Sequence, residues 1–238
     1  MKKTLLFVLA LAVIPVGVDA QGTELAQLRA LAEQGNAVAQ YNLGFRYANG
    51  DGVPQDNAEA ERSYRLAAYQ GHADAQYSLG LMYQLGYGVP EEDAEAERWY
   101  RLAADQGHAD AQSNLGLMYA RGDGVPEDDA EAVRWYRLAA EQGHAGAQYN
   151  LGVKYDSGEG VPEDDVEAVR WYRLAAEQGM AEAQLNLGEK YNNGDGVPQD
   201  YVEAVRWYRL AADQGYATAQ YNVGIMYADG DGVAEDNV

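Results

Sequence analysis

Residues 73–107, ADAQYSLGLMYQLGYGVPEEDAEAERWYRLAADQG, form a phrase that returns along almost the whole chain of 238 residues. Each copy begins 36 residues after the previous one, with no insertion or deletion. A fixed period of this length is typical of repeat proteins in which the units stack on one another. We expect an N-terminal capping half-repeat at residues 21–36, followed by five full repeats and a truncated sixth over residues 37–238. These repeats start at residues 37, 73, 109, 145, 181 and 217.

The first half of each repeat predicts a helix, called helix A below. In the first copy Ala39, Leu43 and Tyr47 are spaced four residues apart and form one apolar stripe. Gly44 lies inside this helix, where glycine costs about 1 kcal/mol relative to alanine. Because this glycine returns in every copy, we expect a neighbouring helix to approach too closely there for a Cβ. Gly50 then ends the helix and a Gly-Val-Pro turn follows.

The second half predicts a helix B. Asp56 and Glu59, three residues apart, resemble a capping box at its start. Ala60, Tyr64 and Ala67 then form its buried stripe, in which small residues beside a tyrosine allow a short distance between helices. One position of helix B is tryptophan in the later repeats and serine in the first: Ser63, Trp99, Trp135, Trp171 and Trp207.

Two short helices per period cannot bury their own apolar faces, so each pair must stack on its neighbours. No run of residues of useful length predicts a β-strand. The sequence therefore predicts an all-α fold, an α/α superhelical solenoid of 36-residue helix-turn-helix repeats.

The phrase Ala-x-Ala-Gln-x-x-Leu-Gly-x-x-Tyr-x-x-Gly-x-Gly-Val-Pro, followed by Glu-Ala-x-Arg-Trp-Tyr-Arg-Leu-Ala-Ala-x-Gln-Gly, resembles the Sel-one-like repeat (SLR), a relative of the tetratricopeptide (TPR) repeat. The resemblance covers about residues 23–238. It implies a TPR-like scaffold for protein–protein assembly, and bacterial members of the family are often exported. A cysteine-rich branch is linked with β-lactam binding and hydrolysis. This chain has no cysteine, so it fits that branch poorly.

The first twenty residues predict a secretory signal peptide. Lys2 and Lys3 precede an apolar run from Leu5 to Ile14, and small residues lead up to Ala20, after which we expect cleavage. The alternative is an uncleaved membrane anchor, but the run is shorter than the roughly 20 residues that span a bilayer. We therefore expect a periplasmic or secreted protein that is not stably inserted in the membrane.

Acidic residues dominate the chain, which has 38 Asp and Glu against 17 Lys and Arg and a formal net charge of −21. This charge repels nucleic-acid phosphates and anionic lipids, so we expect neither as a partner. The absence of cysteine excludes disulfides, thiolate metal sites and a cysteine nucleophile. We also find no cofactor-binding motif.

Three histidines and the acidic turns invite a metal or catalytic interpretation. His72, His108 and His144 share one repeat position, which is Met180 and Tyr216 in later copies, so we expect a structural role there. The acidic turns lack the alternating oxygen ligands of a calcium loop. No serine lies in a Ser-x-x-Lys or Gly-x-Ser-x-Gly motif. We therefore predict no catalytic residue and no metal site.

The better candidate is a ladder of polar residues on helix A that point away from the core. In TPR-like superhelices helix A lines the concave surface, where an amide can both donate to and accept from the backbone of an extended ligand. The alternative is that these amides bond within the solenoid. The ladder consists of Asn42, Ser78, Asn114, Asn150, Asn186 and Asn222, and we add Tyr41, Tyr77 and Tyr149 from the preceding position.

The predicted function is a non-catalytic adaptor that binds a protein or peptide in the concave groove. A secreted factor that acts on a host is the first alternative, and a β-lactam-type hydrolase is the second. The last repeat has no helix B before Val238, and exposed solenoid ends normally need a polar cap. Either the sequence is truncated there, or this end docks on another surface, and end-to-end homodimerisation is one such arrangement.

Overall fold

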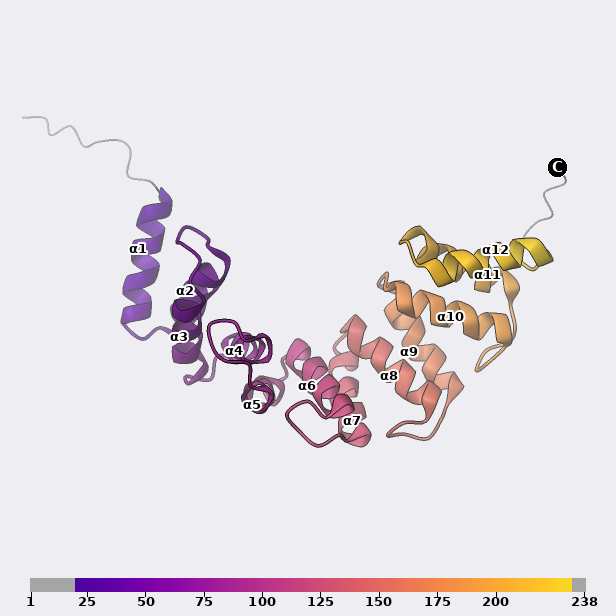
Figure 1. Ribbon diagram of the computed structural model, residues 1–238, viewed down its shortest axis with the longest axis horizontal. Helices are drawn as coiled ribbons and strands as arrows, with labels where there is room; N and C mark the ends of the chain where they lie inside the picture. The colour runs from indigo at the N-terminus through magenta and orange to yellow at the C-terminus, as the bar shows by residue number, and fades with distance from the viewer. Residues whose placement is uncertain (1–19, 233–238) are drawn as a thin grey trace, which may run out of the picture.

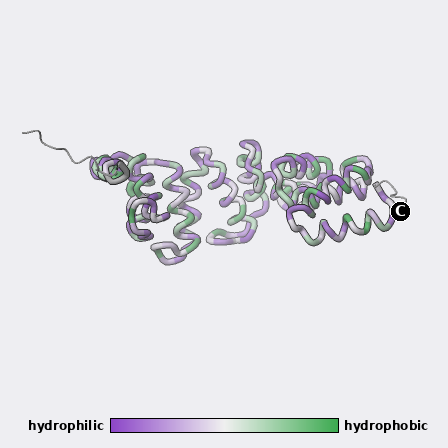
Figure 2. Tube along the Cα trace, turned by 90° about the horizontal axis from the view of Figure 1, so that it is seen from above, coloured by the Kyte–Doolittle hydropathy of each residue, from purple (hydrophilic) through white to green (hydrophobic). Residues whose placement is uncertain are grey.

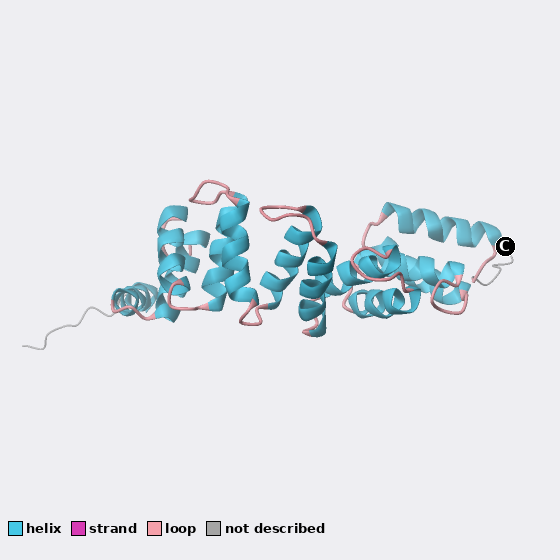
Figure 3. Ribbon diagram, turned by 90° about the horizontal axis from the view of Figure 1, so that it is seen from below, coloured by secondary structure: helices cyan, strands magenta, loops and turns pink. Residues whose placement is uncertain are grey.

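The computed structural model describes residues 20–232, and the described residues form helices joined by loops, with no strand among them (Figure 3). The predicted signal peptide lies outside these residues except for Ala20. The helices are α1 (Ala20–Glu33), α2 (Ala37–Asn49), α3 (Asn57–Ala68), α4 (Ala73–Leu85), α5 (Asp93–Ala104), α6 (Ala109–Arg121), α7 (Asp129–Glu141), α8 (Ala145–Ser157), α9 (Asp165–Glu177), α10 (Ala181–Asn193), α11 (Tyr201–Asp213) and α12 (Ala217–Asp229).

The helices follow one another along a wide arc, and each packs mainly against its neighbours in sequence (Figure 1). Helix A of each repeat is even-numbered, from α2 to α12, and helix B is odd-numbered, from α3 to α11. In the middle of the arc α4 and α6 lie on its inner side, and α5 and α7 lie on its outer side. Hydrophobic and hydrophilic residues are interspersed along the helices (Figure 2), and the buried apolar residues form a series of clusters along the solenoid. The all-α solenoid predicted from the sequence is confirmed.

Helix B begins at an aspartate side-chain cap in α3, α7, α9 and α11, whereas Glu92 before α5 forms no such bond. The carboxylate of Asp56 accepts hydrogen bonds from the backbone N–H groups of Ala58 at 3.0 Å and Glu59 at 3.1 Å. The N–H of Asp56 itself donates to the carbonyl of Tyr47 at 3.0 Å. Since Tyr47 already satisfies that N–H, Glu59 is not needed to complete a capping box, and it pairs with Arg62 instead.

The interior glycine of helix A is explained by the tyrosine of helix B. A Cβ on Gly44 would lie 2.7 Å from Cδ1 of Tyr64, and equivalent distances of 2.6–2.7 Å recur in the next four repeats. Gly224 is the exception, with nothing within 4 Å of its Cβ position. The close approach expected from the sequence is therefore confirmed wherever helix A packs against a described helix B.

A row of buried glutamines ties each repeat to its neighbours, a role that the sequence analysis missed. Nε2 of Gln76 in α4 donates to the carbonyl of Ala68 in α3 at 3.0 Å, and its Oε1 accepts from Nε2 of Gln106, just after α5, at 2.7 Å. The same pair of bonds is formed by Gln40, Gln112, Gln148 and Gln184. These side chains are 4–5% exposed, so each one connects three helices inside the core. The signal was present in the sequence, because glutamine occupies this position in every repeat.

The described helices also bear on membrane attachment. None of them is long and apolar enough to cross a bilayer.

Candidate functional site

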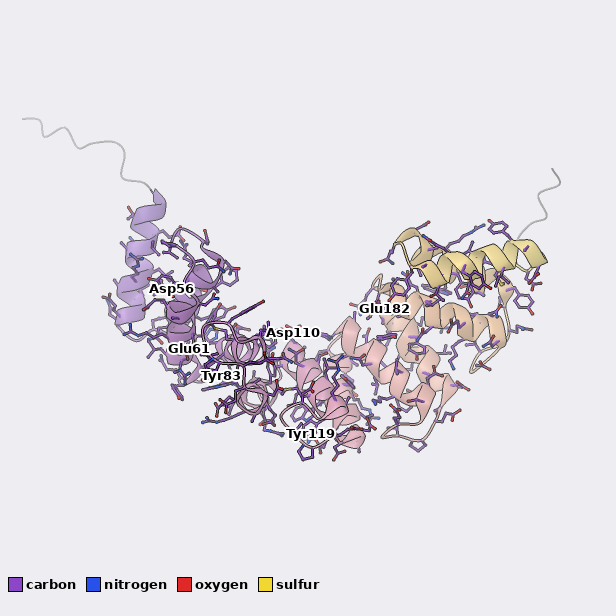
Figure 4. All side chains as sticks on the ribbon, viewed as in Figure 1. Asp56, Glu61, Tyr83, Asp110, Tyr119 and Glu182 are labelled. Carbon is purple, nitrogen blue, oxygen red and sulfur yellow. The ribbon has the colours of Figure 1, made fainter. Side chains whose placement is uncertain are left out.

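A cavity of about 460 Å³ opens where α2, α4 and α6 follow one another along the solenoid. Its lining combines apolar side chains with acidic ones. The residues that line it include Tyr41, Phe45, Asp74, Tyr77, Ser78, Leu81, Leu85, Tyr87, His108 and Asp110. We call this cavity the inner-face pocket, because Asp110 of α6 lies on the inner edge of the arc (Figure 4).

The floor of the inner-face pocket is apolar and unusually exposed. Phe45 and Leu85 are each 50% exposed, and Tyr87 is 56% exposed. The second repeat differs from its relatives at two of these positions. Leu85 stands where the other repeats have a polar residue, and Tyr87 replaces the acidic residue of the turn. These two replacements make the pocket a local feature of the first three repeats.

Carboxylates stand around this apolar floor. Asp74 and Asp110 lie in the first turns of α4 and α6, where the positive end of each helix dipole favours them. Glu182 takes the same position in α10 and also lies on the inner side of the arc (Figure 4). A cationic group on a ligand would therefore find negative charge at the rim of the pocket.

His108 contacts the carboxylate of Asp74 at the rim of the pocket. Its Nδ1 accepts from the N–H of Ala111 at 3.3 Å, so the proton of a neutral imidazole lies on Nε2. Nε2 lies 3.3 Å from Oδ1 of Asp74 in α4, and the ring stacks on Tyr77 at 4.6 Å between centroids. His72 and His144 cap α4 and α8 in the same way. The histidine column therefore caps helices and joins repeats.

The three predicted tyrosines are half-buried and pack against the tyrosine of helix B. Tyr41 and Tyr77 line the inner-face pocket. Their ring centroids lie 5.7 Å from Tyr64 and 5.8 Å from Tyr100. Tyr149 packs in the same manner within the fourth repeat, where its ring centroid lies 5.9 Å from that of Tyr172. The first two are thus available to a ligand of the pocket, whereas Tyr149 lies outside it.

The predicted polar ladder does not form one continuous site. Ser78 lines the inner-face pocket, and its hydroxyl donates to the carbonyl of Asp74 at 2.7 Å. Asn42 is exposed and borders a small cavity of about 250 Å³ beside α1. Asn150 is half-buried. Asn222 borders a polar cavity of about 660 Å³ between α10 and α12.

Part of the ladder contacts tyrosines of the solenoid. Burial raises the pKa of Tyr77 and Tyr100, and a hydrogen bond with the Asn114 side chain opposes this rise in both. Asn186 does the same for Tyr149 and Tyr172. These contacts match the alternative that the amides bond within the solenoid. Both amides remain half-buried, so a ligand can still reach them.

Residues 20–232 contain no group of three or more His, Asp or Glu placed to hold a metal ion. The carboxylates of the turns and first turns serve mainly as helix caps and ion-pair partners. Lys190, for example, contacts Asp156 and lies 2.6 Å from Asp165.

The model of the Sel1 repeat matches residues 37–72, 73–108, 109–144, 145–180, 181–216 and 217–238. The chain belongs to the Sel1 repeat family. No curated protein matches this Sel1 repeat chain. Two solved structures resemble it at both the sequence and the fold level, and a third resembles it in fold alone.

The first is a protective antigen of uropathogenic Escherichia coli with an SLR fold, which is 44% identical with a TM-score of 0.86. That match covers 89% of this chain and 45% of the antigen, so the Sel1 repeat chain spans less than half of its relative's length. A Sel1 repeat protein from Oxalobacter formigenes is 37% identical over 91% of this chain and 90% of its own, with a TM-score of 0.77. A third structure, from Klebsiella pneumoniae, is 23% identical with a TM-score of 0.51, covers 85% of this chain and 98% of its own, and shares the fold.

Several residues of the inner-face pocket were missing from the predicted site. Leu85, Tyr87, Asp74 and Asp110 belong to no column that is constant along this Sel1 repeat chain. Leu85 and Tyr87 could have been found in the sequence because they differ from the residues at the same positions of the other repeats. Positions that are constant in every repeat are those that stabilise the solenoid. Positions that vary between repeats give one part of its surface a different chemistry.

Proposed function

We propose that this Sel1 repeat chain is a non-catalytic scaffold that binds a protein or peptide partner in the inner-face pocket. The observation that carries the proposal is the group of exposed apolar side chains, Phe45, Leu85 and Tyr87, beside the carboxylates of Asp74 and Asp110. Sel1 repeat proteins typically mediate protein–protein interaction, and a separate apolar patch with a charged rim is the kind of surface that such binding uses.

The chemistry of the pocket specifies the partner. Apolar side chains need an apolar anchor, and the carboxylates favour a neighbouring lysine or arginine. The net charge of −21 speeds the encounter with such a basic partner and repels acidic ones. We therefore infer a segment in which a basic residue lies beside leucine, methionine or an aromatic residue.

Location in the bacterial envelope or outside the cell completes the proposal. It rests on the signal peptide inferred for residues 1–20, of which only Ala20 is described. The domain division inferred above, with a capping half-repeat before the full repeats, belongs to the same proposal.

A peptide library displayed against residues 21–238 tests the binding proposal. We expect the selected peptides to combine basic and apolar residues and to bind more weakly as the salt concentration rises. The decisive variant combines Leu85→Asn and Tyr87→Asp, because each change introduces a residue that other repeats carry at the same position. It should remain folded and lose at least about tenfold in affinity, since an apolar side chain contributes about 1.5–3 kcal/mol when fully buried.

Matched controls separate the pocket from the rest of the surface. Leu138→Asn alters an exposed leucine of α7 outside the pocket and should bind like the unchanged chain. Asp74→Asn with Asp110→Asn should weaken binding and reduce its salt dependence. Asn114→Ala, Asn150→Ala and Asn186→Ala together test the polar ladder. If the Leu85 and Tyr87 variant binds the selected peptides as tightly as the unchanged chain, the inner-face pocket is not the binding site.

A host-directed role is the second candidate function. It is favoured by the 44% identity to a protein described as a protective antigen of uropathogenic Escherichia coli. A labelled chain that binds to host cells, and fails to bind after the Leu85 and Tyr87 changes, would favour it over an envelope adaptor.

The two remaining expectations are tested separately. A β-lactam hydrolase would turn over nitrocefin, and we expect no turnover. End-to-end pairing would use α12, which exposes Tyr221 and Tyr227, and a monomeric mass at high protein concentration would exclude it.

A further inference from the structure

Ser63 stands where the four following full repeats have tryptophan, and a cavity of about 520 Å³ lies beside it among α1, α2 and α3. Six of its lining residues carry the argument: Arg29, Ala32, Gln40, Leu43, Arg62 and Ser63. The cavity shares no lining residue with the inner-face pocket. We call it the vacant slot.

Part of the wall of the vacant slot recurs one repeat later around Trp99, but the slot has Glu33 at the position of Tyr69, whose ring centroid lies 5.5 Å from that of Trp99. Ala32, Gln40 and Leu43 correspond to Ala68, Gln76 and Leu79, and Ala68 and Leu79 belong to the same buried cluster as Trp99. Leu79 is fully buried and Trp99 is 1% exposed, whereas Leu43 stays only half-buried. The first repeat therefore has part of the wall of a tryptophan site, but it has Ser63 in place of the tryptophan.

Two arginines of the slot are placed to contact an aromatic ring. In the third full repeat the guanidinium of Arg134 lies 4.8 Å from the centroid of Trp135, and that of Arg101 lies 6.0 Å from it. Arg62 and Arg29 occupy the same two repeat positions around Ser63. Since a guanidinium is attracted to the face of an indole, the slot offers cation–π partners as well as apolar walls.

The indole N–H groups of the chain's own tryptophans have no hydrogen-bond partner. Nε1 atoms of Trp99, Trp135, Trp171 and Trp207 are all buried without a hydrogen bond. The site therefore recognises the shape and the faces of the ring. An indole that enters the slot loses the hydrogen bond of its N–H to water, so burial of the ring and its contacts with the arginines must offset that loss.

We propose that the vacant slot binds the tryptophan side chain of a partner protein. The chain cannot supply this ring itself, because residues 1–62 contain no tryptophan and its four tryptophans are 1–5% exposed in their own sites. The proposal is independent of the inner-face pocket, since the two sites have separate walls.

The test uses N-acetyl-5-fluorotryptophanamide as the probe and follows its ¹⁹F NMR signal during titration with the purified protein. We expect saturable binding at one site, with a dissociation constant on the order of 0.1–1 mM for so small a ligand. Intermolecular NOEs should connect the ring to the methyl groups of Ala32 and Leu43. N-acetylleucinamide should compete at least about tenfold more weakly, because it lacks a ring for the arginines.

Three variants make the test specific. Ser63→Trp supplies the missing ring and should raise the melting temperature while weakening probe binding at least about tenfold. Trp99→Ser should create a second slot and raise the stoichiometry from one to two. Ser157→Trp adds the same side chain at an exposed position of α8 and should leave binding unchanged.

Two results would overturn the proposal. One is the absence of saturable binding by the unchanged protein up to the solubility limit of the probe. The other is unchanged binding by folded Ser63→Trp. If both Ser63→Trp and Trp99→Ser fail to fold, the NOEs of the unchanged protein decide, and contacts with protons other than those of the slot refute the assignment.

Discussion

Gly80 of α4 lies so close to Tyr100 of α5 that a Cβ on the glycine would stand 2.6 Å from Cδ1 of the ring. Real Cβ atoms do not approach other atoms this closely, so the two helices meet at a distance that only glycine permits. Tyr100 is itself fully buried, and its hydroxyl donates to Oε1 of Gln84 at 2.7 Å. The ring therefore has little room to move away.

Alanine at this glycine should be destabilising. We expect Gly80→Ala to lower the free energy of unfolding by about 1–3 kcal/mol, the usual range for an overpacked core. Gly224→Ala is the matched control, because nothing lies within 4 Å of its Cβ position. There the higher helix propensity of alanine should add up to about 1 kcal/mol. Urea denaturation followed by circular dichroism measures both, and equal effects would contradict the steric explanation.

The buried glutamines give a second prediction. Gln112→Ala removes the donor to the carbonyl of Ala104 and the acceptor for Gln142, leaving both groups without that partner. The carbonyl of Ala104 keeps its bond from the N–H of Gly107, and Gln142 is exposed, so we expect a loss of about 0.5–1.5 kcal/mol for each of the two hydrogen bonds removed. Gln220→Ala removes a single, exposed bond of 3.2 Å to Ala212 and should change stability by less than about 0.5 kcal/mol. Thermal melts of the two variants compare them directly, and similar melting temperatures would argue against the bridging role.

The buried tyrosines predict a loss of stability in alkali. Burial raises the pKa of Tyr64 and Tyr136 from 10.0 to about 12. Since the unfolded chain ionises these groups first, it binds fewer protons than the folded chain between these two pH values. The free energy of unfolding should therefore be insensitive to their titration below pH 10 and fall as the pH rises towards about 12.

Urea denaturation at a series of pH values checks this slope. Tyr64→Phe with Tyr136→Phe removes two of the ionising groups and should make the fall shallower than in the unchanged chain. An identical slope in the variant would mean that these two tyrosines do not carry the effect.

A buried lysine provides the fourth prediction. Nζ of Lys190 contacts Asp156 in α8 and lies 2.6 Å from Oδ1 of Asp165 in α9, and the lysine side chain is 11% exposed. Lys190→Met should cost about 1–3 kcal/mol, because two partly buried carboxylates lose their counter-charge. Arg170→Met, which breaks an exposed pair with Glu167, should change stability by less than about 1 kcal/mol. A loss of similar size in both variants would show that burial does not strengthen the Lys190 pair.

The sequence by itself determined the architecture of this protein, because the 36-residue period repeats every element of each helix pair. The glycine that faces Tyr64, the left-handed glycine at the end of α2 and the aspartate that caps α3 could all be identified from their spacing. These features depend on contacts within one repeat or with the next, and such contacts are copied whenever the repeat is copied.

Only the tertiary structure decided which side chains from distant parts of the sequence come together. It brings Gln76 to Gln106 and His108 to Asp74, gathers Leu85 and Tyr87 beside Asp110, and leaves a cavity beside Ser63. The sequence shows only whether each of these residues matches or differs from the residues at the same position of the other repeats. Whether a differing residue fills a space, leaves a cavity or is exposed depends on the distances between the stacked helices. Those distances cannot be obtained from a linear pattern.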